Sequence, residues 1–247
     1  MSLQRIYRYR SLDELTVSMA GRLAKRLSEL QQQKERVHLA LTGGTTALAL
    51  YESLARLAQA TPLDPSRLEL WWTSERYVPT TDQMRNATRA LTVLARTLPF
   101  VPSQVHPMPS STGTMDSDEA AYAYSKELAD VTFDICLLGL GVDGHVASIY
   151  PNHPSLQVQS ETHLSVVGVT NAPIEPSERI TLTLKTFNKS NEIWLLASGE
   201  EKADVVARAV VHHDPLLPAG LVHGASATYW FLDRGAASKL PYYHCRF

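Results

Sequence analysis

The chain has 247 residues, 44% of them hydrophobic, and a formal net charge of −2 with an isoelectric point near 6.5. This length and apolar content predict a globular protein with a substantial core, and its dispersed basic residues argue against a nucleic-acid or membrane-surface binder. No stretch reaches 18 apolar residues and residues 1–10 lack the apolar core of a signal peptide, so we expect a soluble cytoplasmic protein.

Predicted strands and helices alternate through the first half of the chain. Apolar residues recur at spacings of three and four from Leu12 to Leu30, and Ser11 with Glu14 forms a capping-box pattern, so a helix is expected there. Short apolar runs followed by helical patterns continue the alternation. The pattern predicts strands over residues 6–9, 37–41 and 68–72 and helices over residues 11–33, 47–60 and 83–98.

The second half contains a fully apolar run that begins after Asp134 and ends in glycines. The proline-rich residues 99–114 before it are too poor in apolar side chains for regular structure, so we expect an irregular connection. Further strands are expected over residues 164–169, 192–197 and 227–232, and helices over residues 116–129 and 200–212. The order predicts an α/β fold, with one domain over residues 1–247: an open, mostly parallel Rossmann-like sheet, helices on both faces and a few smaller strands.

A glycine turn follows the second predicted strand. Gly43, Gly44 and Thr45 lie between that strand and the next helix. Backbone N–H groups in such a turn point into a concavity at the positive end of the helix, and a threonine hydroxyl adds a donor. The segment is therefore a candidate phosphate site. The alternative is a tight turn in which Thr45 or Thr46 only caps the helix.

The glycines after the apolar run form the sequence Gly139-Leu-Gly-Val-Asp-Gly144, which matches the dinucleotide pattern G-x-G-x-x-G. That fingerprint requires a long helix opening at its third glycine, and Pro151 and Pro154 come too early for one. We therefore reject a nucleotide site. The glycines, Gly141 among them, are instead expected to leave room for a ligand beside the backbone.

His145 is the one group at this strand end that ordinarily titrates near neutral pH, and Asp143 can orient it or hold its protonated form. We expect a functional pair, the alternative being a histidine that only caps or fills the loop. A metal site is disfavoured, because the histidines lack a ligand spacing on one helix and the two cysteines, Cys136 and Cys245, are not paired.

Three cations follow predicted strands or precede one. Arg76 comes after the strand at residues 68–72, Arg179 precedes an apolar alternation, and Lys202 follows the strand at residues 192–197. Each alone is more often a solvated surface charge. Three such residues at strand ends indicate a site for a phosphorylated ligand.

Together these segments resemble the 6-phosphogluconolactonase family, a branch of the sugar-phosphate isomerase and deaminase-like folds. The most specific match is the G-x-D-G-H-x-A-S pattern that ends at Ser148. The resemblance covers most of the chain. The matching segments are Leu41-Thr-Gly-Gly-Thr-Thr46, Trp71-Trp-Thr-Ser-Glu-Arg-Tyr-Val-Pro79, Arg85-Asn86, Leu138-Gly-Leu-Gly-Val-Asp-Gly-His-Val-Ala-Ser148, Arg179-Ile-Thr-Leu182 and Gly199-Glu-Glu-Lys202.

The resemblance implies hydrolysis of 6-phospho-D-glucono-1,5-lactone to 6-phosphogluconate, in the oxidative pentose phosphate pathway, without a metal or organic cofactor. It implies that His145 activates water and Asp143 supports it. Independently of the resemblance, we expect the oxyanion to be held by N–H groups near Gly141 or by Arg76. The sequence leaves a monomer and a homodimer open. The residues expected to bind substrate are Gly43, Gly44, Thr45, Arg76, Asn86, Gly141, Arg179 and Lys202.

Two positions depart from related patterns. Ser74 stands where the family usually has aspartate, and Tyr150 stands where glucosamine-6-phosphate deaminases carry a catalytic glutamate. Both differences disfavour a deaminase or isomerase. A non-catalytic sugar-phosphate sensor stays open as a further alternative, because Ser74 removes a carboxylate, although the retained Asp143 and His145 argue for catalysis.

Overall fold

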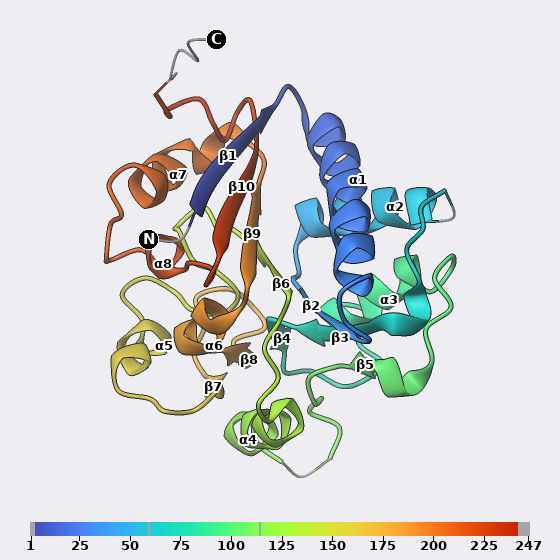
Figure 1. Ribbon diagram of the computed structural model, residues 1–247. Coiled ribbons are helices and arrows are strands. Elements are labelled where there is room, and N and C mark those ends of the chain that lie inside the picture. The colour runs from blue at the N-terminus through green and yellow to red at the C-terminus, as the bar shows by residue number, and fades with distance from the viewer. Residues whose placement is uncertain (1–2, 59, 114, 242–247) are drawn as a thin grey trace.

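Seven parallel strands form the centre of the molecule, in the order β1-β10-β9-β6-β2-β3-β5 (Figure 1). The computed structural model describes residues 3–58, 60–113 and 115–241. Position 245, one of the two cysteine positions, and the last residue of the 99–114 segment lie outside them. The strands are β1 (Leu3–Tyr9), β2 (Val37–Leu41), β3 (Leu68–Trp72), β4 (Ser74–Arg76), β5 (Val105–His106), β6 (Ile135–Gly139), β7 (Val166–Val169), β8 (Arg179–Leu182), β9 (Glu192–Ala197) and β10 (Ala227–Asp233).

Helices lie on both sides of the central sheet, as Figure 1 shows. A second, antiparallel sheet of order β4-β8-β7 lies beside it and packs against α4. The predicted fold class is thereby confirmed. The α-helices are α1 (Leu12–Gln31), α2 (Thr45–Ala58), α3 (Asn86–Leu94), α4 (Ser117–Leu128), α5 (Pro154–Gln157), α6 (Leu184–Lys189), α7 (Ala203–Val210) and α8 (Pro218–Leu221), and the 3₁₀ turns are η1 (Pro65–Arg67), η2 (Pro102–Gln104), η3 (Val158–Ser160) and η4 (Glu200–Lys202).

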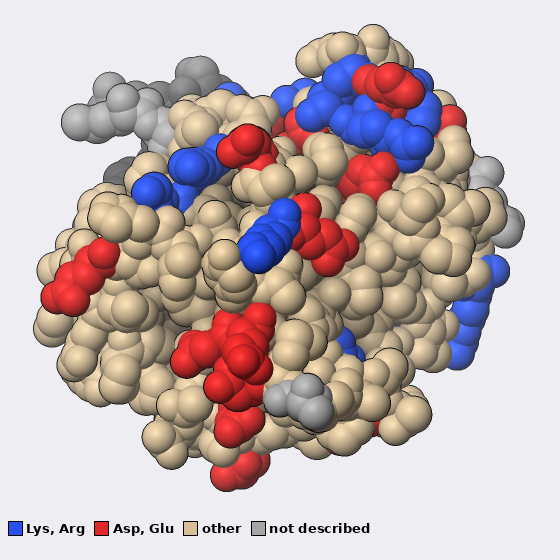
Figure 2. Space-filling model, turned by 90° about the horizontal axis from the view of Figure 1, so that it is seen from below, with Lys and Arg blue, Asp and Glu red and all other residues tan. Residues whose placement is uncertain are grey.

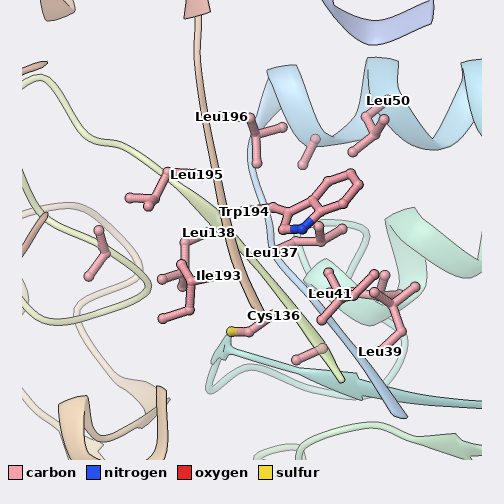
Figure 3. Packing of buried hydrophobic residues seen from close by; sticks show 14 of the residues in the cluster. Leu39, Leu41, Leu50, Cys136, Leu137, Leu138, Ile193, Trp194, Leu195 and Leu196 are labelled. Carbon is pink, nitrogen blue, oxygen red and sulfur yellow. The ribbon is translucent and has the colours of Figure 1, made fainter. Parts of the chain in front are cut away.

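The central sheet is buried on both faces. In β6 and β9, Leu137 pairs with Trp194 and Leu138 with Leu195. Figure 3 shows Leu137 and Trp194 on the side of α2, while Leu138 and Leu195 point the other way. These four side chains are 0–4% exposed. A parallel strand covered on both faces needs a continuous apolar run, which is the pattern that β6 has.

The strand order reverses between β2 and β6, since the chain builds β3 and β5 on one side of this pair and β9, β10 and β1 on the other. Open parallel sheets hold their ligands in the crevice outside the carboxyl ends of the strands at such a point. The glycine turn follows β2, and the segment with Asp143 and His145 follows β6. The topology therefore brings both motifs to one edge of the sheet.

Several element boundaries differ from the prediction. The segment over residues 99–114 is not wholly irregular, because β5 pairs with β3 through Leu70–Val105 and Trp71–His106. The strand expected over residues 164–169 is β7 of the antiparallel sheet. The predicted helix over residues 83–98 is α3, which begins at Asn86 and ends at Leu94. A two-residue strand carries too weak a sequence pattern to be predicted, and the apolar pattern of β7 does not reveal which sheet it joins.

On the face of the molecule seen in Figure 2, a group of basic side chains with a few acidic ones among them lies at the upper right, and a separate group of acidic side chains lies below the centre. Among the helices that the structure describes, none is both long and apolar enough to span a membrane.

Candidate active site

A cavity of about 200 Å³ opens at the carboxyl ends of β2 and β6, where the sheet order reverses. Its walls come from both sheets. All the predicted site residues except Asp143 line it directly, and Asp143 contacts His145 from outside the cavity. The lining residues of the prediction are Gly43, Gly44, Thr45, Arg76, Asn86, Gly141, His145, Arg179 and Lys202.

The glycine turn forms the floor of the cavity at the start of α2. Gly44 has a φ of +102°, a conformation that favours glycine. The helix begins at Thr45, two residues earlier than predicted, so the turn and the first N–H groups of a 14-residue helix face one space. Tyr51 fixes the strand end below, since its Oη bonds both the N–H (2.9 Å) and the carbonyl (2.8 Å) of Thr42. This arrangement can hold an anion.

Two arginines meet on the small sheet. Arg76 of β4 pairs directly with Arg179 of β8 in the antiparallel register. The Nε of each is buried and has no hydrogen-bond partner within the described chain, and neither forms an ion pair there. Burial, and then the charge of Arg179, lower the pKa of Arg76. Two guanidinium groups that line one cavity, that of Arg179 buried and that of Arg76 partly buried, favour an anionic ligand between them.

Lys202 reaches the same cavity from the turn after β9. The loop before it is held by Asp233, whose carboxylate accepts from the Gly199 N–H (3.1 Å) and from Ser198 Oγ (2.5 Å). Burial lowers the pKa of Lys202, while the nearby charges of Glu201 and Asp233 oppose that shift. Lys202 makes no ion pair with the residues described, which leaves its ammonium group available to a ligand.

His145 and Asp143 form a close pair at the opposite wall. His145 Nδ1 lies 2.6 Å from Asp143 Oδ1, and the His145 backbone N–H also donates to that oxygen at 3.1 Å. Burial would raise the pKa of Asp143, but the hydrogen bonds and charge of His145 lower it overall. Because an ionised carboxylate accepts at Nδ1, that nitrogen carries the proton, and Nε2 is left as the acceptor.

Gly141 provides space for this pair. A Cβ at position 141 would lie 2.0 Å from His145 Nδ1 and 2.6 Å from Asp143 Oδ1, so any other residue would displace the pair. Its own N–H donates to the His145 carbonyl (2.9 Å) and is therefore not free to hold an oxyanion. Arg76 and the other N–H groups of this loop stay predictions for the oxyanion donor.

Asn86 connects three parts of the site. Its Oδ1 accepts from Arg76 Nη1 (2.7 Å), and its Nδ2 donates to the Ser74 carbonyl (2.8 Å). A Cβ at Gly43 would lie 2.2 Å from Asn86 Oδ1, so the amide also packs against the glycine turn. Asn86 thus joins α3, β4 and the turn after β2.

Several lining residues were not predicted as ligands, Ser74, Ala147 and Tyr150 among them. Ser74 is 5% exposed, and Tyr150 is 1% exposed with its ring 4.7 Å from that of His145. Ala147 adopts a φ of +53° in the same loop. The deaminase comparison drew attention to Ser74 and Tyr150, but no sequence signal marked Ala147. Among the residues described, no three His, Cys, Asp or Glu side chains are grouped so as to hold a metal ion.

Comparison with known proteins decides the family. The sequence model described as glucosamine-6-phosphate isomerases/6-phosphogluconolactonase matches residues 10–230. The chain belongs to this family. Within it, the chain is 38% identical to the 6-phosphogluconolactonase of Streptomyces coelicolor, over 94% of this chain and 93% of that protein. The 6-phosphogluconolactonase of Mycobacterium tuberculosis is 39% identical, over 92% of this chain and 95% of the relative.

Solved structures of the family share the fold. The 6-phosphogluconolactonase of Thermotoga maritima superposes with a TM-score of 0.81 at 28% identity, covering 93% of this chain and 99% of that one. The Trypanosoma brucei 6-phosphogluconolactonase gives a TM-score of 0.81 at 26% identity, covering 98% and 100%. A monomeric glucosamine-6-phosphate deaminase has a TM-score of 0.77 at 24% identity, a likeness of fold alone.

Proposed function

We propose that this family member hydrolyses 6-phospho-D-glucono-1,5-lactone to 6-phosphogluconate in the oxidative pentose phosphate pathway. The observation that carries the proposal is the His145–Asp143 pair at a cavity that Arg76, Arg179 and Lys202 also line. A base at one wall and an anion site at the other match a substrate with a reactive carbonyl and a distant phosphate. The curated relatives named 6-phosphogluconolactonase support the same reaction.

The phosphate would bind at the floor of the cavity. The N–H groups of the turn from Gly43 to Thr45 and the positive end of α2 supply donors, and Arg179 and Lys202 supply charge. A phosphate held there fixes the far end of the sugar and presents the lactone carbonyl to His145. Because the bound lactone is already oriented toward the base, the reaction proceeds within one complex and does not depend on a chance encounter in solution.

Hydrolysis would then follow from the tautomer of His145. Its Nε2 accepts a proton from water as the water oxygen bonds to the lactone carbonyl carbon, and Asp143 stabilises the imidazolium. Arg76 balances the negative charge that develops on the carbonyl oxygen. The C–O bond to the ring oxygen breaks as the imidazolium returns its proton to that oxygen. The ring opens to the acid, and His145 is again neutral.

Two positions favour hydrolysis over deamination. Ser74 and Tyr150 line the cavity and carry no carboxylate, whereas the deaminase pattern requires acids at both places. The enzyme is proposed to act in the cytoplasm, as a monomer or homodimer, with the phosphorylated lactone as its partner and without nucleic acid.

The decisive test generates the lactone in situ with glucose-6-phosphate dehydrogenase and follows acid release with and without the protein. We expect acceleration over spontaneous hydrolysis. His145→Ala should lose most turnover and still bind 6-phosphogluconate, because the phosphate site is intact. Binding of 6-phosphogluconate by the wild type without any acceleration would instead support a sugar-phosphate sensor.

A further inference from the structure

Glu75 is a fully buried carboxylate at the back of the site. It is 0% exposed and lies in β4 between Ser74 and Arg76, but it does not line the cavity. A buried carboxylate is costly unless hydrogen bonds satisfy it. The groups that hydrogen-bond to Glu75 therefore indicate its role in the structure.

Three backbone N–H groups converge on this carboxylate. Oε1 accepts from Asn86 (2.6 Å) and from Arg76 (2.9 Å), and Oε2 accepts from Ala87 (2.9 Å). The Arg85 guanidinium lies 3.9 Å away. Asn86 and Ala87 are the first two residues of α3, whose preceding residue, Arg85, makes no side-chain cap. Glu75 thus takes the place of the missing cap from another element of the chain.

The same carboxylate also sets the position of the ligand-facing groups. The Asn86 backbone is held by Glu75, and the Asn86 side chain in turn holds Arg76 Nη1 at 2.7 Å and packs against Gly43. A shift of the α3 N-terminus would therefore move the guanidinium group and the glycine turn together. The path runs from Glu75 through Asn86 to the cavity.

We propose that Glu75 is a positioning residue for lactone hydrolysis, acting through Asn86 to place the Arg76 guanidinium and the turn at Gly43. The inference rests on the proposed function. Glu75 touches no reacting atom in this scheme. It differs from a purely structural residue because its loss should impair the folded enzyme rather than only reduce the fraction that is folded.

The test compares Glu75→Gln with Glu192→Gln. Glu192 is a matched control: it is 4% exposed in β9 and is bonded by Arg26 (2.7 Å) and Trp194 Nε1 (2.9 Å), but it lies at the opposite end of the strand from the site. At a temperature where circular dichroism shows each variant fully folded, Glu75→Gln should lower kcat/KM about tenfold, since small displacements of positioned groups have effects of this size. Glu192→Gln should leave kcat/KM unchanged, whatever it does to the melting temperature.

A double-mutant cycle with Asn86→Ala tests the path. If Glu75 acts through Asn86, then Glu75→Gln should cost less than twofold, roughly, in the Asn86→Ala background, because coupled residues are not additive. A full tenfold loss in that background, or no loss in the single variant, would overturn the inference. Should Glu75→Gln not fold, Glu75→Asp, which keeps the charge but shortens the side chain by one methylene, is judged by the same cycle.

The test of the positioning role can be distinguished from the test of the proposed function. If the wild type does not accelerate lactone hydrolysis, the proposed function fails. The positioning role is then measured by the affinity for 6-phosphogluconate, which Glu75→Gln should weaken and Glu192→Gln should not. If the wild type is active and Glu75→Gln matches it in both kcat/KM and affinity, the positioning role alone fails.

Discussion

Replacing Gly141 by alanine is the sharpest test of the proposed base. The new Cβ would lie 2.0 Å from His145 Nδ1, whereas an ordinary contact is about 3.5 Å, so the imidazole must move by roughly 1.5 Å. A 1 Å misplacement of a catalytic group can cost about a hundredfold in rate. We therefore expect Gly141→Ala to lower kcat by about a hundredfold.

The assay is acid release from lactone generated in situ, with the spontaneous rate subtracted. Gly21→Ala is the matched control, because Gly21 lies in α1 and a Cβ there meets nothing within 4 Å. The affinity for 6-phosphogluconate should be retained in both variants, since neither touches the proposed phosphate site. A kcat within twofold of wild type for Gly141→Ala would refute the assignment of His145 as the base.

Three further outcomes are expected from charged groups. The pKa of Lys202 is lowered, so kcat/KM should fall on the alkaline side at a lower pH than an ordinary lysine would give. Lys202→Arg should move that fall to higher pH. Identical pH profiles for the two proteins would contradict this. Arg179→Ala should raise KM more than it lowers kcat, whereas Lys239→Ala, which removes only an exposed ion pair with Asp204, should change neither. The lowered pKa of Asp143 stabilises the folded state at pH values above the ordinary aspartate pKa, and this stability is lost as the pH falls through the pKa of the folded state. In urea unfolding, the free energies of unfolding of wild type and Asp143→Asn should therefore converge in acid. A difference in free energy that stays constant with pH would be inconsistent with the pair.

Sequence patterns predicted the central sheet because each of its main strands is a short apolar run bounded by turn residues. The run from Ile135 to Gly139 is the best example, since it is buried on both faces and carries no competing helical period. The small sheet was harder to predict. Its strand β4 is three residues long and is defined by a partner, β8, that lies a hundred residues later in the chain.

The site likewise contains residues that the sequence pattern predicts and residues that it does not. His145, Asp143 and the glycine turn were found because their residue types carry chemistry at a strand end. Glu75 was missed, although a carboxylate that follows the Leu68–Trp72 strand after only Thr73 and Ser74 is a usable signal for a buried, satisfied acid. The occupied N–H of Gly141 could not be inferred, because its acceptor depends on how the loop closes on the His145 carbonyl.

The pairing of Arg76 with Arg179 makes the empty site electrostatically unfavourable. The two guanidinium groups lie on adjacent strands and repel each other, and burial and then this repulsion lower the pKa of Arg76. An anion between them would replace repulsion with attraction and would join the small sheet to the turn that follows β2. A ligand at a hundred times its dissociation constant adds about 2.7 kcal/mol to the free energy of unfolding. The thermal stability of the protein should therefore serve as a direct gauge of how well any phosphorylated compound fits the site.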